Sequence, residues 1–123
     1  MKNIFITNIL IVLLMTGIAV CEERIHFTNS AIELHGFSSL LNEGDIISVY
    51  DSDNILCGKS QVQVNGQYGL MSVYRDDPLT KNIDEGAEPG DILSVYLNDK
   101  LISPVNIDTI VWTQNGDLIQ IDF

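Results

Sequence analysis

The sequence predicts an all-β fold: one antiparallel, immunoglobulin-like β-sandwich of about seven or eight strands. Two observations support it. No segment after position 21 has the apolar spacing of a helix, and turn-forming residues recur about every eight to twelve positions between short runs rich in Ile, Val, Leu and Tyr. The remaining chain of about a hundred residues can bury one modest core, so we expect a single domain at 22–123.

The first 19 residues are predicted to be an export signal. Lys2 supplies a short positive region, and an apolar run follows at 9–15. This run is shorter than the ~20 residues that a membrane-spanning helix needs. Small residues precede a cleavage position after Ala19. We therefore exclude residues 1–19 from the fold and expect a secreted protein, either extracellular or periplasmic.

The two cysteines leave two processing routes open. The segment 18–21 resembles a bacterial lipobox, except that Val20 stands where Gly, Ala or Ser is usual. A lipid on Cys21 would tether the domain to a membrane at the cell surface, and membrane contact is expected only through this anchor. If both cysteines instead remain in the mature chain, an oxidising compartment permits a disulfide between Cys21 and Cys57.

The charge balance is strongly acidic. Seventeen Asp and Glu oppose six Lys and Arg, which gives a formal net charge of −11 at pH 7. Nucleic acid is excluded as a partner, because its phosphates would be repelled. An anionic membrane surface is disfavoured for the same reason. The charge is compatible with solubility outside the cell and with cation binding.

Alternation of apolar and polar residues predicts the strands. Segment 31–36 is a clear case, because Ile32 and Leu34 fall on one face and His35 on the other. His26 also falls on the polar side of its segment, so both histidines are expected to be solvated or hydrogen-bonded. The expected strands, in chain order, are 24–28 at an edge, 31–36, 46–51, 55–64, 68–74, 92–96, 100–102, 109–113 and 118–123.

Turn residues predict how these strands connect. Asn65-Gly66 is a strong hairpin signal and predicts that 61–64 pairs with 68–74. The run QNGD at 114–117 predicts a closing hairpin between 109–113 and 118–123. The run DSDN at 51–54 resembles the start of a calcium loop, but the Gly and the later acids of an EF-hand are missing. A hairpin turn explains it better, since Asp and Asn side chains cap turns.

A short repeat and the aromatic residues are the next features. The run GDILSVY at 90–96 copies GDIISVY at 44–50 with one difference, either by duplication or as two independent solutions to one local problem; we expect the second. Tyr50, Tyr74 and Tyr96 are expected on one sheet face, where exposed aromatic side chains favour contact with a protein or a carbohydrate. Trp112, the only tryptophan, is expected in the core.

The segment 76–91 is dense in carboxylates, with Lys81 as its one cation. Unpaired carboxylates at this density repel one another unless a cation, solvent or hydrogen bonds stabilise them. The segment therefore predicts either a Ca²⁺ site or a series of local turn caps. The candidate metal ligands are Asp76, Asp77, Asp84, Glu85, Glu88 and Asp91.

Several motifs resemble a known module. They are CG at 57–58, GQYGLM at 66–71, VYRDDPLT at 73–80, DEGAEPGD at 84–91 and VWTQNGD at 111–117. Together they are similar to a module that recurs in secreted and cell-surface proteins of bacteria, whose plan is similar to the transthyretin-like, carboxypeptidase-regulatory class of β-sandwich. The resemblance covers about 31–122. It implies an extracellular, non-catalytic module.

Three functions follow as expectations. The first is a non-catalytic secreted or surface-attached module for binding or structural support, whose partner is another protein or a surface polymer and which Ca²⁺ stabilises. The second is an extracellular hydrolase that uses the carboxylates of 76–91. The third is a self-assembling surface subunit in which an edge strand, at 24–28, completes the sheet of a neighbouring copy.

Overall fold

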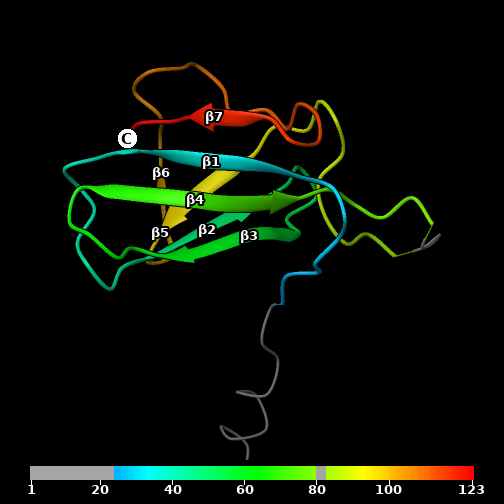
Figure 1. The fold of residues 1–123 in the computed structure, drawn as a ribbon, viewed down its shortest axis with the longest axis horizontal. Helices are drawn as coiled ribbons and strands as arrows, with labels where there is room; N and C mark the ends of the chain where they lie inside the picture. Colours follow the sequence, from blue (N-terminus) through cyan, green and yellow to red (C-terminus); the bar gives the residue numbers. More distant parts are fainter. Residues whose placement is uncertain (1–23, 80–82) are drawn as a thin grey trace, which may run out of the picture.

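The computed structural model describes residues 24–79 and 83–123 and shows two β-sheets packed face to face (Figure 1). One sheet has three strands in the order β4-β1-β7, and the other has four in the order β3-β2-β5-β6. The prediction of an all-β sandwich is confirmed. The strands are β1 (Ala31–Phe37), β2 (Ile46–Tyr50), β3 (Leu56–Gln61), β4 (Gln67–Tyr74), β5 (Ser94–Leu97), β6 (Lys100–Ile102) and β7 (Leu118–Gln120).

Alternate residues of the strands fill the space between the two sheets. In β1, Ile32 and Leu34 are buried while their neighbours are half-exposed, as the alternation predicts. Trp112 lies in this core at 1% exposure, and its Nε1–H donates a hydrogen bond of 2.9 Å to the carbonyl oxygen of Val73. The other fully buried large side chains are Leu41, Ile47, Val49, Cys57, Val62, Met71, Val73, Val95 and Ile121.

Two predicted hairpins are wrong in their strand pairing. The turn at Asn65-Gly66 is present, but only Val64 and Gln67 pair across it, and β3 and β4 belong to different sheets. The reason is that the backbone of Val62 already exchanges hydrogen bonds with the turn before β2, donating to Asp45 and accepting from Gly44. The chain therefore crosses from one sheet to the other between 62 and 67.

The predicted closing hairpin fails for a similar reason. The backbone around Trp112 pairs with 90–93, because Trp112 N–H donates to Asp91 and Trp112 C=O accepts from Gly90. β7 instead lies parallel to β1, with Glu33 opposite Leu118. The predicted edge strand at 24–28 is also wrong, because no strand forms there. The strands at the sheet edges are β4, β7, β3 and β6.

The sequence repeat falls on two neighbouring strands of one sheet. β2 and β5 run antiparallel with Val49 opposite Val95, Ser48 opposite Tyr96 and Tyr50 opposite Ser94. A local two-fold axis through the Val49–Val95 pair therefore exchanges the two copies. Each strand continues through a tight turn into the next, β2 into β3 and β5 into β6, which gives the sheet its symmetric order β3-β2-β5-β6.

The turns that precede the two copies are also alike. Asp45 Oδ2 accepts the backbone N–H of Asn42 at 2.9 Å, and Asp91 Oδ2 accepts that of Glu88 at 2.9 Å. The glycine before each aspartate donates its N–H to the strand on the outer side, at Val62 in one copy and at Trp112 in the other. The two copies are therefore similar in the hydrogen bonds of the turns that precede them as well as in their seven repeated residues.

None of the described residues forms a helix that could cross a membrane.

Candidate metal site and surface hollows

The turn between β2 and β3 is organised by Asp51, which is only 2% exposed. Its Oδ1 accepts the backbone N–H groups of Asp53 at 2.8 Å and Ile55 at 2.9 Å. Its own backbone N–H donates to Ile55 C=O, which closes the turn. The expected capping role of this DSDN run is therefore what the structure shows.

The second carboxylate oxygen of Asp51 is in a different situation. Oδ2 is buried and makes no hydrogen bond within the part of the chain that the structure describes. Burial of a polar group without a partner costs free energy, and a carboxylate costs more than a neutral group. Burial accordingly raises the pKa of Asp51, and the nearby charges of Asp53 and Asp91 add to this effect. The structure thus places a costly anionic oxygen at the end of the sandwich.

Asp84 reaches the same place from the loop after β4. This loop is held against the end of β4, because Ala87 N–H donates to Tyr74 C=O at 3.0 Å and Asp76 N–H donates to Ala87 C=O at 2.8 Å. Gly86 fits this contact only because it has no side chain: a Cβ there would lie 2.5 Å from Tyr74 O. The loop and the turn at 51–54 both lie at the right-hand end of the molecule in Figure 1.

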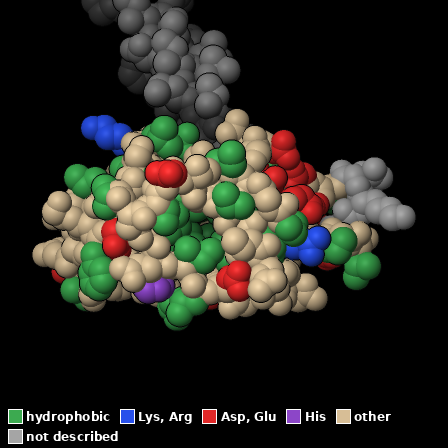
Figure 2. Space-filling model, turned by 90° about the horizontal axis from the view of Figure 1, so that it is seen from above, with side chains coloured by type: hydrophobic (Ala, Val, Ile, Leu, Met, Phe, Trp, Pro, Cys, Tyr) green, Lys and Arg blue, Asp and Glu red, His purple; other side chains and the backbone are tan. Residues whose placement is uncertain are grey.

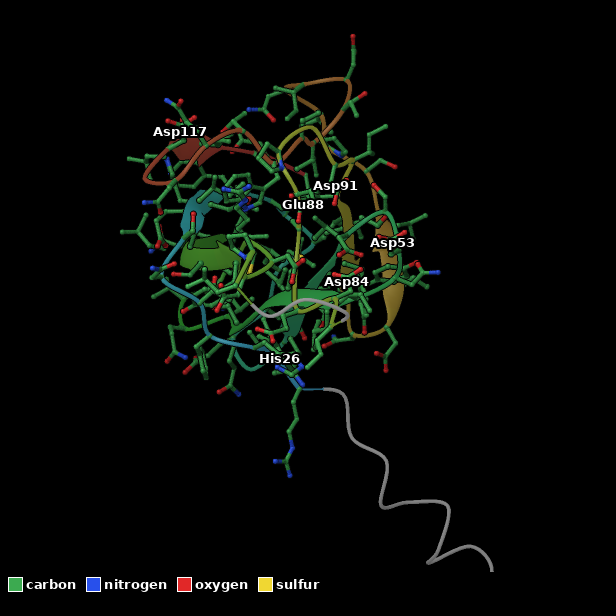
Figure 3. All side chains as sticks on the ribbon, turned by 90° about the vertical axis from the view of Figure 1, so that its right-hand side faces the viewer. His26, Asp53, Asp84, Glu88, Asp91 and Asp117 are labelled. Atoms are coloured by element: carbon green, nitrogen blue, oxygen red, sulfur yellow. The ribbon has the colours of Figure 1, made fainter. Side chains whose placement is uncertain are left out.

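Three carboxylates converge at this end. Each of Asp51, Asp53 and Asp84 offers an oxygen, and these oxygens all lie within 4.8 Å of one another. Figure 3 looks at this end and shows Asp53 and Asp84 side by side. Desolvation raises the pKa of Asp84 to about 6, with smaller contributions from the charge of Asp51 and the contact with Asp53. Figure 2 shows acidic side chains gathered at the same end.

The geometry and the donor set fit a hard cation. Two ligands on opposite sides of a Ca²⁺ ion at about 2.4 Å lie about 4.8 Å apart. The oxygens of the three residues meet this condition, because all of them lie within 4.8 Å of one another. The donors are all carboxylate oxygens, with neither imidazole nor thiolate among them, which favours Ca²⁺ or Mg²⁺ over Zn²⁺ or Cu²⁺. The three residues can therefore hold a divalent metal ion.

Of the six predicted metal ligands, only Asp84 belongs to this group. Asp76 Oδ1 accepts the N–H of Glu85 at 2.9 Å, and Asp77 Oδ1 accepts that of Leu79 at 2.9 Å. Glu88 forms an ion pair with Arg75 at 3.7 Å, and Asp91 caps the turn before β5. The alternative of local turn caps thus describes most of this segment. Lys81 lies outside the described residues.

The sequence reasoning missed Asp51 and Asp53 as metal ligands. The signal was present in the DSDN run at 51–54, which was assigned a purely structural role. The third acid does not follow in the same loop, as it would in an EF-hand, but comes from Asp84 in a different loop. Only the packing of that loop against β4 brings it close, and no local spacing encodes this.

The three tyrosines do not share one sheet face, so that prediction is wrong. Tyr50 and Tyr96 alternate with the buried Val49 and Val95 and lie on the outer face of the four-stranded sheet. Their rings meet edge to face, with centroids 5.4 Å apart. Tyr74 lies on the outer face of the other sheet. The sandwich separates the two positions because β4 and β2 belong to different layers.

Two surface hollows accompany the metal group. The larger one has a volume of about 680 Å³ and borders strands β1, β3, β4 and β7. Its lining includes Gln61, Gln63, Gln67, Phe37 and Leu70, together with the histidine His35. The smaller one, about 280 Å³, is lined by Tyr50, Asn54, Tyr96 and Asp99. The lining of the larger hollow therefore contains no Asp or Glu, and the lining of the smaller hollow contains one, Asp99.

Cys57 is fully buried in β3, and its Sγ lies 3.4 Å from the carbonyl oxygen of Val49. Burial raises the pKa of the thiol to about 12, so it is not a nucleophile at neutral pH. Cys21, the predicted disulfide partner and alternative lipidation site, lies outside the described residues, so both of those predictions stand as predictions.

Neither histidine belongs to the group formed by Asp51, Asp53 and Asp84. His35 is half-exposed on the outer side of β1, on the polar face that the alternation predicts. His26 is exposed, in a segment that forms no strand.

Comparison with known proteins finds no matching family model, no matching curated protein and no matching solved structure.

Proposed function

We propose that the protein is a non-catalytic, secreted or surface-attached β-sandwich module that Ca²⁺ stabilises at Asp51, Asp53 and Asp84. The observation that carries the proposal is the buried Oδ2 of Asp51, which has no hydrogen-bond partner among the described residues, in a residue that belongs to the carboxylate group. Without a cation this oxygen is desolvated, and Asp51 lies close to two further carboxylates. A bound cation would give this oxygen a partner, and it would replace the repulsion among the three carboxylates with attraction to the ion.

Calcium is favoured over magnesium by where the ligands come from. Asp51 and Asp53 belong to one turn, and Asp84 belongs to a different loop, which follows β4 in the chain. Ca²⁺ accepts variable coordination by six to eight oxygens, whereas Mg²⁺ demands a near-ideal octahedron. Asp53 and Asp84 are exposed, so water can supply the remaining ligands. We expect weak binding, with a Kd of about 10⁻⁴ to 10⁻³ M, as in extracellular modules.

The ion would act as a clip between two segments far apart in the chain. It would join the turn that connects β2 to β3, in the four-stranded sheet, to the loop that leaves β4, in the three-stranded sheet. The loop's other attachments at this end are backbone hydrogen bonds to β4 and the Arg75–Glu88 ion pair. Such a clip lets a small extracellular domain hold a long connection in one conformation for a protein or surface-polymer partner.

The test is a thermal melt of the purified full chain in chelator, in Ca²⁺ and in Mg²⁺. A native-state ligand at ten times its Kd stabilises by about 1.4 kcal/mol, which corresponds to a rise in midpoint of roughly 5–10 °C for a domain of this size. Asp84→Asn is expected to remove the response to Ca²⁺. Asp108→Asn, an equal charge change at an exposed position elsewhere, is expected to retain it.

The outcome that defeats the proposal is equally defined. If 10 mM Ca²⁺ leaves the midpoint unchanged, or if Asp84→Asn and Asp108→Asn respond alike, the three carboxylates hold no calcium. If Mg²⁺ raises the thermal midpoint as much as Ca²⁺ does, the metal site is supported but the preference for Ca²⁺ is not.

A further inference from the structure

The smaller hollow lies on the outer face of the four-stranded sheet and combines two aromatic rings with a carboxylate. Its lining is Tyr50, Asn54, Tyr96 and Asp99, and its volume is about 280 Å³. We propose that this hollow binds a quaternary ammonium group, such as the trimethylammonium end of choline. This is a site distinct from the metal group, because the two share no residue.

The repeated sequence builds this hollow. Tyr50 and Tyr96 are the last residues of the two GDIxSVY copies, and the local two-fold axis brings them to the same face of the sheet. The turn that follows each copy then supplies one polar side chain, Asn54 after β2 and Asp99 after β5. Every residue of the lining therefore comes from one of the two similar strands or from the turn that follows it.

The two rings form a corner. Their planes are inclined at 84°, and their centroids are 5.4 Å apart, so the edge of one ring meets the face of the other. A flat ligand could stack on only one of two rings inclined in this way. A compact cation seated in such a corner contacts the electron-rich face of one ring and lies near the other, the geometry of cation–π recognition.

The charge around the hollow also favours a cation. Asp99 is the only charged residue in the lining, and it is anionic. The nearby strand β3 carries Lys59 opposite Ser48, but Lys59 is not part of the lining. The whole chain has a net charge of −11, so its long-range field attracts cations and repels anions.

Two of the lining residues also have positive φ, which the turns after β2 and β5 require. Asn54, Asn98 and Asp99 are the non-glycine residues with positive φ in the described chain, at 62°, 47° and 68°. This region of φ is costly for a residue with a side chain, although least so for Asn and Asp. Asn98 uses its side chain to bind Asp45 and the N–H of Ile46. The side chains of Asn54 and Asp99 line the hollow and make no hydrogen bond inside the described structure.

The chemistry of the lining selects among cations. A primary ammonium carries three N–H donors and a tightly held hydration shell, and it needs several acceptors to replace that shell. The hollow offers one carboxylate and one amide oxygen beside apolar ring surface. A quaternary ammonium has no N–H to satisfy and presents methyl groups to the rings. It therefore matches the lining better than a lysine or a free amine does.

The experiment is a ligand-observed NMR titration of the full chain with choline and, separately, with its neutral isostere 3,3-dimethyl-1-butanol. The expected Kd for choline is about 1–10 mM, since only two half-buried rings and one carboxylate contact the ligand. The isostere has the same shape without the charge and is expected to bind at least about tenfold more weakly, a difference of about 1.4 kcal/mol. Equal binding of the two compounds would overturn the proposal, as would no binding of choline at 50 mM.

Two conservative variants keep the test free of folding defects. Asp99→Asn removes the charge and tolerates the same backbone conformation, and it is expected to weaken choline binding about tenfold, to the level of the isostere. Tyr96→Phe keeps the aromatic ring and is expected to bind choline as the parent does, whereas Tyr96→Leu is expected to lose binding. Asp108→Asn is the matched charge control. Unchanged affinity in Asp99→Asn would contradict the proposed role of the carboxylate.

The same chemistry occurs free in solution and on lipid head groups. Co-sedimentation with phosphatidylcholine vesicles separates the two sources. We expect binding of free choline without co-sedimentation, because the acidic surface and the shallow hollow offer little to a bilayer. Co-sedimentation that Asp99→Asn abolishes would keep the site and assign it to the lipid.

Discussion

A carboxylate oxygen of Asp84 lies within 4.8 Å of one of Asp51, although the two residues belong to loops that leave different sheets. Each of the two groups would be stable alone at the surface of a protein. Together with Asp53 they form a cluster of three carboxylates, which only the folded chain brings together. The free energy of this arrangement depends on what neutralises it, either protons or a cation.

The first prediction concerns pH in the absence of divalent ions. The folded-state pKa of Asp84 is about 6, above the ordinary value of 3.8. Folding is therefore favoured by protonation of this group, and its contribution is full below about pH 4 and is lost as the pH rises through 6. In chelator, we expect the thermal midpoint to fall between pH 5 and pH 7. The fall should be smaller in Asp84→Asn, which cannot ionise.

Calcium should reverse this trend. Metal binding requires ionised carboxylates, so protons compete with the ion. The increase in midpoint caused by 10 mM Ca²⁺ is expected to grow from pH 5 to pH 7. A calcium effect that is independent of pH over this range would argue that Asp84 is not a ligand.

The second prediction concerns Gly86. A methyl group at this position would meet the backbone of Tyr74 and Arg75 at 2.5–3.0 Å, and backbone cannot move aside as a side chain can. Gly86→Ala is expected to destabilise the fold by about 1–3 kcal/mol, the usual cost of overpacking. It should also weaken the response to Ca²⁺, since it displaces the loop that carries Asp84. Urea unfolding with and without Ca²⁺ measures both effects. In Gly116→Ala no atom lies within 4 Å of the added group and the strain comes from its φ of 88°, so this variant is expected to lose stability without losing the response to Ca²⁺.

The third prediction concerns the thiol of Cys57. It is completely buried and has a raised pKa, so it should not react with a thiol reagent while the protein is folded. In a Cys21→Ser variant, titration with an aromatic disulfide reagent at pH 8 is expected to detect no thiol in buffer and one thiol in denaturant. Rapid reaction in buffer would mean that β3 opens readily.

The fourth prediction separates stability from the proposed ligand. Asp99 has a φ of 68°, a conformation that glycine adopts without steric cost. Asp99→Gly is expected to raise the thermal midpoint slightly or leave it unchanged, and to abolish the preference for choline over its neutral isostere. Loss of stability in this variant would show that the side chain supports the turn instead.

Much of the fold could be predicted from local patterns. The alternation at 31–36, the apolar run at 46–50 and the two-residue turn at Asn98-Asp99 all correspond to strands and turns in the structure. These features depend on residues close together in the chain. The symmetric pairing of the repeated strands was not predicted, because a sequence repeat does not determine whether its two copies belong to the same sheet.

The failures concern partners that are far apart. The Asn65-Gly66 turn was identified, but whether its flanking strands stay in one sheet depends on competition from the turn before β2. The metal group needed Asp84 to meet Asp51 and Asp53, and only the contact of Ala87 with Tyr74 brings it there. Charge density alone pointed to 76–91, where most of the acids cap their own loop.

The parallel pairing of β7 with β1 affects when the three-stranded sheet can form during translation. The backbone of Ala31 bonds to the side chain of Asn115, 84 positions later, and β1 lies between β4 and β7. A chain still emerging from the ribosome can bring β1 and β4 together but has one flank of β1 bare until residues 118–120 arrive. Contacts of such long range are slow to form. The sandwich is therefore expected to close only after synthesis has passed β7, which exposes an unprotected strand edge to chaperones and proteases throughout translation.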